Sequence, residues 1–216
     1  MANLITGIDV SKYQFDIDWT KIQQPITPFD PPAIVFAYIK ATEGVGYIDP
    51  NAQSNATGAK GAGLKIGYYH FATLNNAANP VADAQSEAQA FLVAMAKLPA
   101  HDLPPVLDIE KNVSNLTKQQ VLDWIHSFYS ELEKNGVNKY IIYSYKYFLD
   151  PYLPANHGLG NIPLWLANYS KVTAPPLPIG WNSYAIWQYR SDGQFTGKSG
   201  KPVPCDVNKG NDGFWL

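Results

Sequence analysis

Eight short strand-like segments, mostly separated by helical segments, limit the folds open to this chain more than any other feature. The strand-like segments span residues 4–10, 33–40, 64–71, 104–110, 140–144, 163–169, 184–189 and 203–208. Residues 33–40 are almost continuously apolar, which is typical of a strand buried on both faces. Apolar periodicity and capping residues indicate helices over residues 49–61, 80–98 and 117–136. This alternation predicts an α/β fold built on a parallel sheet with right-handed crossovers.

Acidic residues near the ends of three of these strands indicate that the sheet closes on itself. Asp9 lies in the first strand, Asp108 and Glu110 end the fourth, and Asp206 lies in the last. In an open sheet the first and last strands can be far apart. In a closed barrel they are neighbours, and active sites lie at the carboxyl ends of the strands. We therefore predict a TIM-like β/α barrel of about eight strands with the four acids in one mouth.

Asp108 and Glu110 form an acid-x-acid pair at the end of the strand that Pro104 and Pro105 open. Side chains at i and i+2 of a strand share a face, about 6.5–7 Å apart along the backbone. Two carboxylates held together out of bulk water resist joint ionisation, so one pKa rises and that acid stays protonated near neutral pH. Hydrolysis of a glycosidic bond needs such a protonated acid beside an ionised one. The same residues also fit a strand that runs into a solvated turn, where acids are common.

The charge and the aromatic content of the chain limit the kinds of molecule that it is expected to bind. The net charge is −2 and there is no run of Lys or Arg, which argues against nucleic acid or an anionic membrane surface as a partner. Aromatic residues make up 13% of the chain, with 14 Tyr and 6 Trp. These rings fit either core packing or a groove on which sugars stack. The length of 216 residues fits one domain with a full core better than two small ones.

Several features that suggest other sites have plainer explanations. Cys205 is the single cysteine, so no internal disulfide forms. In a strand its side chain points away from the face that carries Asp206, so we expect a buried side chain that packs in the core rather than a nucleophile. We expect His70 to be packed and hydrogen-bonded, because no histidine has metal-site spacing. The glycines at 61, 63 and 67 precede a strand, whereas a phosphate loop follows one. We expect neither a membrane-spanning segment nor a standard export signal in this chain.

Several short motifs, in their joint order, make the chain resemble the lysozymes of glycoside hydrolase family 25. The resemblance covers nearly the whole length. No single motif is decisive, because an acid-x-acid pair alone is common. The motifs are GIDVS at 7–11, DW at 18–19, YIKATEG at 38–44, GL at 63–64, GYYHF at 67–71, DIE at 108–110, LWLANY at 164–169, WQY at 187–189 and DVN at 206–208.

The resemblance implies an irregular β/α barrel that lacks some outer helices, in keeping with the helix-poor last third. Because no internal repeat or low-complexity tail is visible, we expect a single catalytic domain over residues 1–216, without the separate wall-binding module that members of this family often carry. It also implies cleavage of the β-1,4 bond between N-acetylmuramic acid and N-acetylglucosamine in peptidoglycan. Glu110 matches the general acid of the family, and Asp108, Asp9 and Asp206 match the acids that complete its site. We expect substrate contacts from Tyr69, Lys40, Tyr143, Trp165, Tyr169 and Gln188.

Two routes are open for the second half of the reaction. Asp108 could be a direct nucleophile, or it could orient the 2-acetamido group of the substrate for attack on the anomeric carbon. Because Asp108 and Glu110 lie on the same side of one strand, attack from opposite faces of a sugar ring is awkward. We therefore favour the substrate-assisted route, which is a known exception to the two-carboxylate scheme.

Two other functions compete with this one. The four acids could be oxygen ligands of a divalent metal in a hydrolase or phosphotransferase, although nothing in the chain resembles a phosphate cradle. The chain could also be a catalytically silent sugar-binding barrel, but binding alone does not require a protonated Glu beside ionised Asp residues. We expect a monomer without metal or other cofactor. It would act on the cell wall, after release by lysis, by a dedicated secretion system, or with an export signal already removed.

Overall fold

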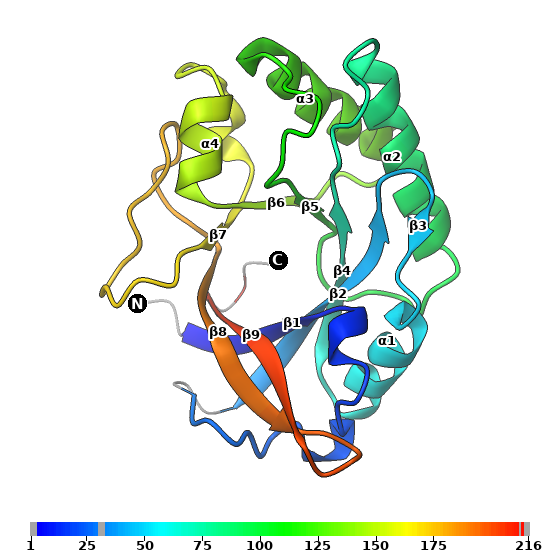
Figure 1. Ribbon diagram of the computed structural model, residues 1–216, viewed down its shortest axis with the longest axis vertical. Coiled ribbons are helices and arrows are strands. Elements are labelled where there is room, and N and C mark those ends of the chain that lie inside the picture. Colours follow the sequence, from blue (N-terminus) through cyan, green and yellow to red (C-terminus); the bar gives the residue numbers. More distant parts are fainter. Residues whose placement is uncertain (1–3, 30–32, 212, 214–216) are drawn as a thin grey trace.

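The barrel is closed, as the sequence predicts (Figure 1). The computed structural model describes residues 4–29, 33–211 and 213. One sheet runs in the order β1-β9-β8-β7-β6-β5-β4-β2-β3, and a further pairing of β1 with β2 closes eight of the strands into a ring. The strands are β1 (Leu4–Val10), β2 (Ile34–Glu43), β3 (Tyr47–Ile48), β4 (Lys65–Phe71), β5 (Val106–Asp108), β6 (Ile141–Ser144), β7 (Leu164–Ala167), β8 (Ile186–Thr196) and β9 (Pro202–Asn211).

The last strand runs in the opposite direction to the rest of the ring. β9 is antiparallel to both of its neighbours, β1 and β8, so the prediction of a wholly parallel sheet is wrong there. β8 continues to Thr196 and turns back into β9 through a short loop in which Gly200 has a φ of +79°. Asp206 therefore reaches the mouth from the middle of an antiparallel strand, directly opposite Asp9 in the register. The barrel is mixed, and its two end strands meet as closure requires.

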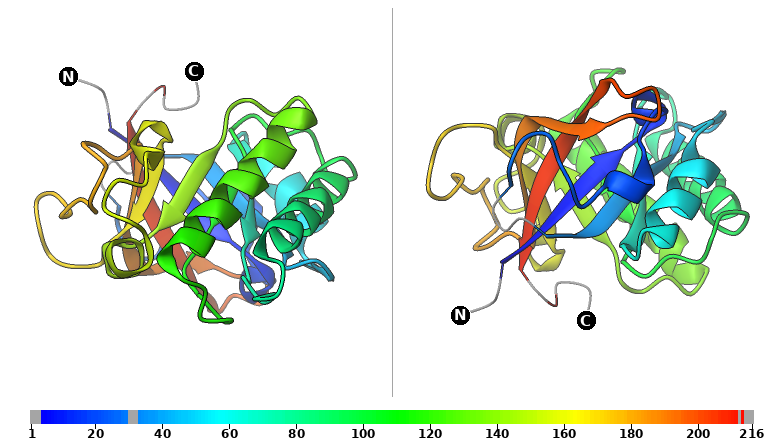
Figure 2. Two further views of the ribbon diagram at one scale, coloured as in Figure 1. Left: turned by 90° about the horizontal axis from the view of Figure 1, so that it is seen from above. Right: turned by 90° about the horizontal axis from the view of Figure 1, so that it is seen from below.

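Helices cover only part of the barrel. They are α1 (Ala52–Gly61), α2 (Pro80–Met95), α3 (Lys118–Lys134) and α4 (Lys146–Tyr152). The Asn79 and Thr117 side chains cap α2 and α3, which were predicted, whereas the short α4 was not predicted. After α4, the described residues contain no α-helix, and Figure 2 shows α2 and α3 side by side on the flank away from β8 and β9. Within the described part of the chain, every helix is too short or too polar to cross a bilayer.

Two apolar layers flank the strands. The larger lies between the strands and the helices and includes Phe91 and Phe128. The smaller fills the interior of the barrel with large rings, among them Phe36, Tyr38 and Trp165. Glycine makes room for two of these rings, because a Cβ atom at Gly7 would lie 2.2 Å from Phe36 and one at Gly67 would lie 2.3 Å from Tyr38. The interior is therefore packed, and polar groups gather beyond it at one end.

The predicted structural roles of His70 and Cys205 are confirmed. His70 is fully buried between the strands and α2, with Nδ1 2.8 Å from Thr42 Oγ1 and Nε2 2.7 Å from Glu87 Oε2. Cys205 is also buried, and its thiol donates to the Asp9 carbonyl oxygen at 3.2 Å. Both side chains tie strands of the barrel to their surroundings and leave the mouth to other residues.

Candidate active site

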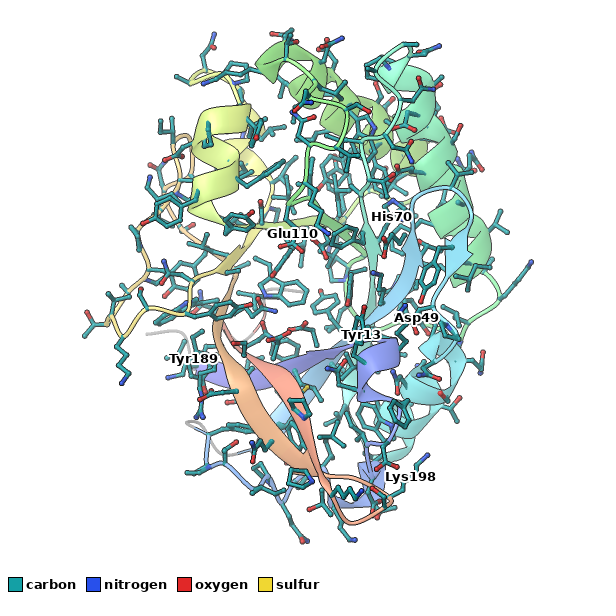
Figure 3. All side chains as sticks on the ribbon, in the orientation of Figure 1. Tyr13, Asp49, His70, Glu110, Tyr189 and Lys198 are labelled. Atoms are coloured by element: carbon teal, nitrogen blue, oxygen red, sulfur yellow. The ribbon has the colours of Figure 1, made fainter. Side chains whose placement is uncertain are left out.

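Four acids meet at one end of the barrel, as predicted. Asp9 lies on β1, Asp206 lies opposite it on β9, Asp108 ends β5, and Glu110 follows two residues later. All four line one open pocket of about 230 Å³. Figure 3 shows Glu110 beside the opening of the barrel. The ring closure that joins β1 to β9 is what brings acids so distant in the sequence together.

Asp9 is fixed as a hydrogen-bond acceptor. Its Oδ2 receives hydrogen bonds from Gln188 Nε2 and Asn208 Nδ2, both at 2.8 Å, and the residue is only 9% exposed. Burial raises the pKa of Asp9 to about 6, and the two amide donors oppose that rise. Asp9 is therefore mainly ionised above pH 6, and its charge points into the pocket.

Aromatic donors set the orientation of the two amides that hold Asp9. Gln188 Oε1 accepts from the Tyr143 hydroxyl at 2.7 Å and from the Tyr169 hydroxyl at 2.6 Å. Asn208 Oδ1 accepts from Trp165 Nε1 at 2.8 Å. Because each amide oxygen is occupied in this way, each amide nitrogen is left to face Asp9. The aromatic side chains thus position the Asp9 carboxylate indirectly, the two tyrosines through Gln188 and Trp165 through Asn208.

Asp108 is buried without full hydrogen bonding. It is 6% exposed, and no donor reaches its Oδ1 among the described residues. Burial raises its pKa well above the usual range, the Glu110 charge adds to the rise, and Lys40 opposes it. An unpaired buried acceptor costs folding free energy. Such a group persists at a site where a ligand supplies the missing donor.

Glu110 has a different environment from Asp108. Burial is the main cause that raises its pKa, the Asp9 charge adds to the rise, and Lys111 opposes it. The backbone on either side is held in place, since Ser144 Oγ donates to the Ile109 carbonyl at 2.6 Å and the Tyr145 hydroxyl to the Glu110 carbonyl at 3.3 Å. A rigid backbone thus presents a carboxyl group that favours its protonated form.

Asp206 gives the site its clearest link between pH and stability. Burial raises the pKa of Asp206 to about 8, and the charges of Asp9 and Glu110 add to the rise. Between about pH 4 and pH 8 the unfolded chain has lost this proton while the folded protein still holds it. The free energy of unfolding therefore falls as the pH rises through that window.

We expect Asp206→Asn to abolish the fall in the free energy of unfolding between about pH 4 and pH 8. A rise of the pKa from 3.8 to about 8 corresponds to roughly 5 kcal/mol at pH 8, and solvent screening of this partly exposed carboxyl group reduces it. The variant should therefore be more stable than the wild type by on the order of 2 kcal/mol at pH 8, and the gain should vanish near pH 4. Urea unfolding at pH 4, 6 and 8 measures the difference. Asp123→Asn, on the exposed face of α3, controls for the general effect of removing a carboxylate. A gain that stayed constant across the pH range would contradict the assignment to Asp206.

The structure places nine of the ten predicted site residues on the pocket wall. Tyr169 is the exception, because it is 50% exposed and does not line the pocket, although its hydroxyl donates to Gln188 Oε1. Lys40 lines the wall with its Nζ 2.6 Å from Glu43 Oε2. Trp165 and Tyr143 are buried and form the floor of the pocket.

Sequence reasoning missed some residues of the site. Asn208 was not expected, although it lies two residues beyond Asp206 and so shares its face of the strand. Phe71 follows Tyr69 by the same spacing and also lines the pocket. The remaining omissions are Val10 at the end of β1 and, in the 3-10 turn after it, Ser11, Tyr13 and Gln14. The turn carries no periodic signal. Among the described residues, no group of three or more His, Cys, Asp or Glu is arranged to hold a metal ion.

Comparison with known proteins identifies the relatives of this barrel. The family model described as glycosyl hydrolases family 25 matches residues 8–198. Lysozyme M1 of Streptomyces globisporus is 32% identical over 213 residues, which cover 96% of this chain and 68% of that protein. The autolytic lysozyme of Clostridium acetobutylicum is 30% identical over 96% of this chain, but only 56% of its own length is covered. The crystal structure of a bacterial lysozyme from Streptomyces coelicolor superposes with a TM-score of 0.78 at 32% identity, covering 96% of this chain and 92% of that one.

Proposed function

Because the chain belongs to glycosyl hydrolases family 25 and is a hydrolase of the lysozyme type, we propose that it cleaves the β-1,4 bond between N-acetylmuramic acid and N-acetylglucosamine. We propose further that Glu110 is the general acid and that Asp108 orients the acetamido group of the substrate. The observation that carries this proposal is the buried Asp108 oxygen without a donor, next to a second acid whose pKa is raised.

Glu110 protonates the oxygen of the bond that breaks. Its carboxyl group lines the open pocket, and burial raises its pKa and so favours the acid form that can donate a proton. As the bond between the anomeric carbon and this oxygen breaks, the proton moves from Glu110 to the leaving sugar. The Glu110 carboxylate that remains can then take a proton from the water that enters in the second step.

The acetamido N–H of the substrate donates to Asp108 Oδ1. This bond supplies the donor that the free protein lacks, and it favours the ionised form of Asp108. Protons shared among the four acids then reside on Glu110 rather than on Asp108. The acetamido oxygen, steered by Asp108, attacks the anomeric carbon and forms a cyclic oxazolinium ion. Water opens this ion, and the product keeps the configuration of the substrate.

The remaining acids stabilise and hold the sugar. Asp9 keeps its charge near neutral pH through its two amide donors, so it favours the positive charge that develops at the anomeric carbon. Asp206 stands opposite Asp9 and accepts from a sugar hydroxyl. Tyr69 and Lys40 on the wall, and the Trp165 and Tyr143 floor, contact the sugar rings. Tyr169 and Gln188 act on the sugar through the same hydrogen-bonded network.

The bond that is cut can be identified by mass spectrometry of the fragments released from purified peptidoglycan. We expect soluble fragments with N-acetylmuramic acid at the reducing end, with or without a chelator, and retained configuration by proton NMR at early times. Fragments ending in N-acetylglucosamine would contradict the bond assignment. Activity that disappeared with chelator and returned with a divalent ion would favour a metal-dependent hydrolase. Binding to the wall without release of fragments would favour a silent sugar-binding barrel.

A further inference from the structure

A second groove lies on the outer face of β8, behind the pocket that holds the acids. Gln188 points into the barrel, so its neighbours Trp187 and Tyr189 point outward and line this groove. Its volume is about 770 Å³, and its outer wall is the segment of residues 169–173. In Figure 3, Tyr189 lies at the edge of the molecule, to the side of Glu110.

Tyr169 joins the groove to the acid pocket. Its side chain lines the groove, while its hydroxyl donates to Gln188 Oε1 at the edge of the acid pocket. The segment that carries Tyr169 is attached to β8 at two points. Asn168 N donates to the Gln188 carbonyl at 3.0 Å, and Trp187 Nε1 donates to the Asn168 carbonyl at 2.8 Å. The groove is therefore linked to the acid pocket through the hydrogen bond from Tyr169 to Gln188.

The groove is basic, in contrast to the acid pocket. Lys171, Lys209, Arg190 and Asp192 line it. Arg190 Nε pairs with Asp192 Oδ1 at 2.7 Å, so these two charges offset each other. Within the described residues, neither lysine has a carboxylate at ion-pair distance, and Lys209 Nζ lies 4.8 Å from the centre of the Tyr189 ring. As far as the described residues are concerned, the charges of Lys171 and Lys209 are thus left to bind an anion.

We propose that this groove binds the peptide stem of the peptidoglycan substrate through the carboxylates of the stem. The inference rests on the proposed function, because a muramic acid seated in the acid pocket carries such a stem on its lactyl group. The glycan itself offers the four acids an uncharged surface, whereas the free carboxylates of the stem would be repelled there and attracted by Lys171 and Lys209. The Trp187 and Tyr189 rings supply an apolar floor for the methyl groups of the stem.

The test compares two soluble glycan oligomers of equal length. One carries its stem peptides. In the other an amidase has removed them, and the lactyl carboxylates that this exposes have been capped as methyl amides. We expect the wild type to favour the stem-bearing oligomer in kcat/KM. Lys171→Gln/Lys209→Gln should lower kcat/KM on that oligomer about fivefold, mainly through KM, and change the stem-free oligomer by less than about twofold. Added salt should reduce the preference of the wild type.

A matched control variant distinguishes the effect of losing the two groove lysines from the effect of lowering the net charge of the protein. Lys198→Gln/Lys201→Gln removes the same charge from the tip of the β8–β9 hairpin, which Figure 3 shows far from Tyr189. We expect this variant to keep the preference of the wild type. An equal loss in both double variants, or an equal loss on both oligomers, would overturn the proposal. So would tighter binding of a glycerol phosphate oligomer than of the stem-bearing glycan, measured by calorimetry.

The groove and the proposed function can fail separately. Calorimetry on Glu110→Gln protein measures binding of the two oligomers without turnover. If the wild type hydrolyses neither oligomer, the proposed function falls. A higher affinity for the stem-bearing oligomer that depends on Lys171 and Lys209 would then still support the groove. Equal affinities for the two oligomers would overturn it whatever the outcome for hydrolysis.

Discussion

We expect Glu110→Gln to lower kcat for peptidoglycan by a factor of about 10³ while the folded protein stays as stable as the wild type. Glutamine has nearly the same shape but cannot give a proton to the leaving oxygen. The substitution should not destabilise the fold, because burial already disfavours the charged form of Glu110 and the backbone contact from Tyr145 is unaffected. Release of soluble fragments measures kcat, and urea unfolding measures stability.

A substrate with a better leaving group isolates the role of Glu110. An aryl glycoside needs little protonation to depart, so Glu110→Gln should recover most of its activity on such a substrate. Glu133→Gln, on the exposed end of α3, is the matched control and should behave as the wild type on both substrates. Activity of Glu110→Gln within tenfold of the wild type on peptidoglycan would remove Glu110 from the general-acid role. An equal loss on both substrates would indicate a different role for this side chain.

Much of the barrel could be predicted because strands and helices leave periodic signals. Alternation places Asp9 on the face opposite Ile8 and Val10, and both apolar neighbours are indeed buried. Capping residues fixed the start of α2 and α3 for a local reason, since one side chain satisfies one backbone amide. Closure needed a further argument, because periodicity in one strand says nothing about its partner.

The direction of β9 could not be obtained in that way. A strand has the same alternation whichever way it runs, so Val207 is buried and Asp206 faces the pocket in either direction. The direction of a strand depends on the segment that connects it to the strand before. The second half of β8 is polar and contains glycine, so it lacks the apolar alternation that would have predicted a hairpin between β8 and β9. Position 193 in β8 requires a glycine, because a Cβ atom there would lie 2.4 Å from the Val207 side chain of β9. The sequence does not reveal this contact between the two strands.

The orientation of the amides in the site was equally inaccessible. Gln188 was expected to touch substrate, yet its two ends are already occupied by Asp9 and by two tyrosine hydroxyls. Its amide nitrogen donates to Asp9, and that of Asn208 does the same from β9. Such a network depends on the distances between side chains from four strands. The types of residue can be recognised from the sequence, but their connections come only from the closed barrel.

Asp108→Asn separates the two routes that remained open for the second half of the reaction. We expect kcat to fall about 10³-fold, because asparagine carries no charge to stabilise the oxazolinium ion or to polarise the acetamido group. The fold should not suffer, since the substitution removes a buried carboxyl group that lacks a donor. Asp206→Asn removes a carboxyl group from the same pocket and should lose much less activity, because Asp206 holds the sugar without taking part in bond formation.

Azide distinguishes an orienting Asp108 from a nucleophilic one. If Asp108 formed a covalent bond to the anomeric carbon, azide could replace it in Asp108→Asn and yield a glycosyl azide of inverted configuration. In the substrate-assisted route the acetamido oxygen still occupies that face of the sugar, so azide should neither restore the rate nor appear in this product. Intact-protein mass spectrometry of the wild type during turnover should likewise show no glycosyl adduct. A trapped adduct on Asp108, or rescue by azide, would replace the substrate-assisted route with direct nucleophilic attack by Asp108.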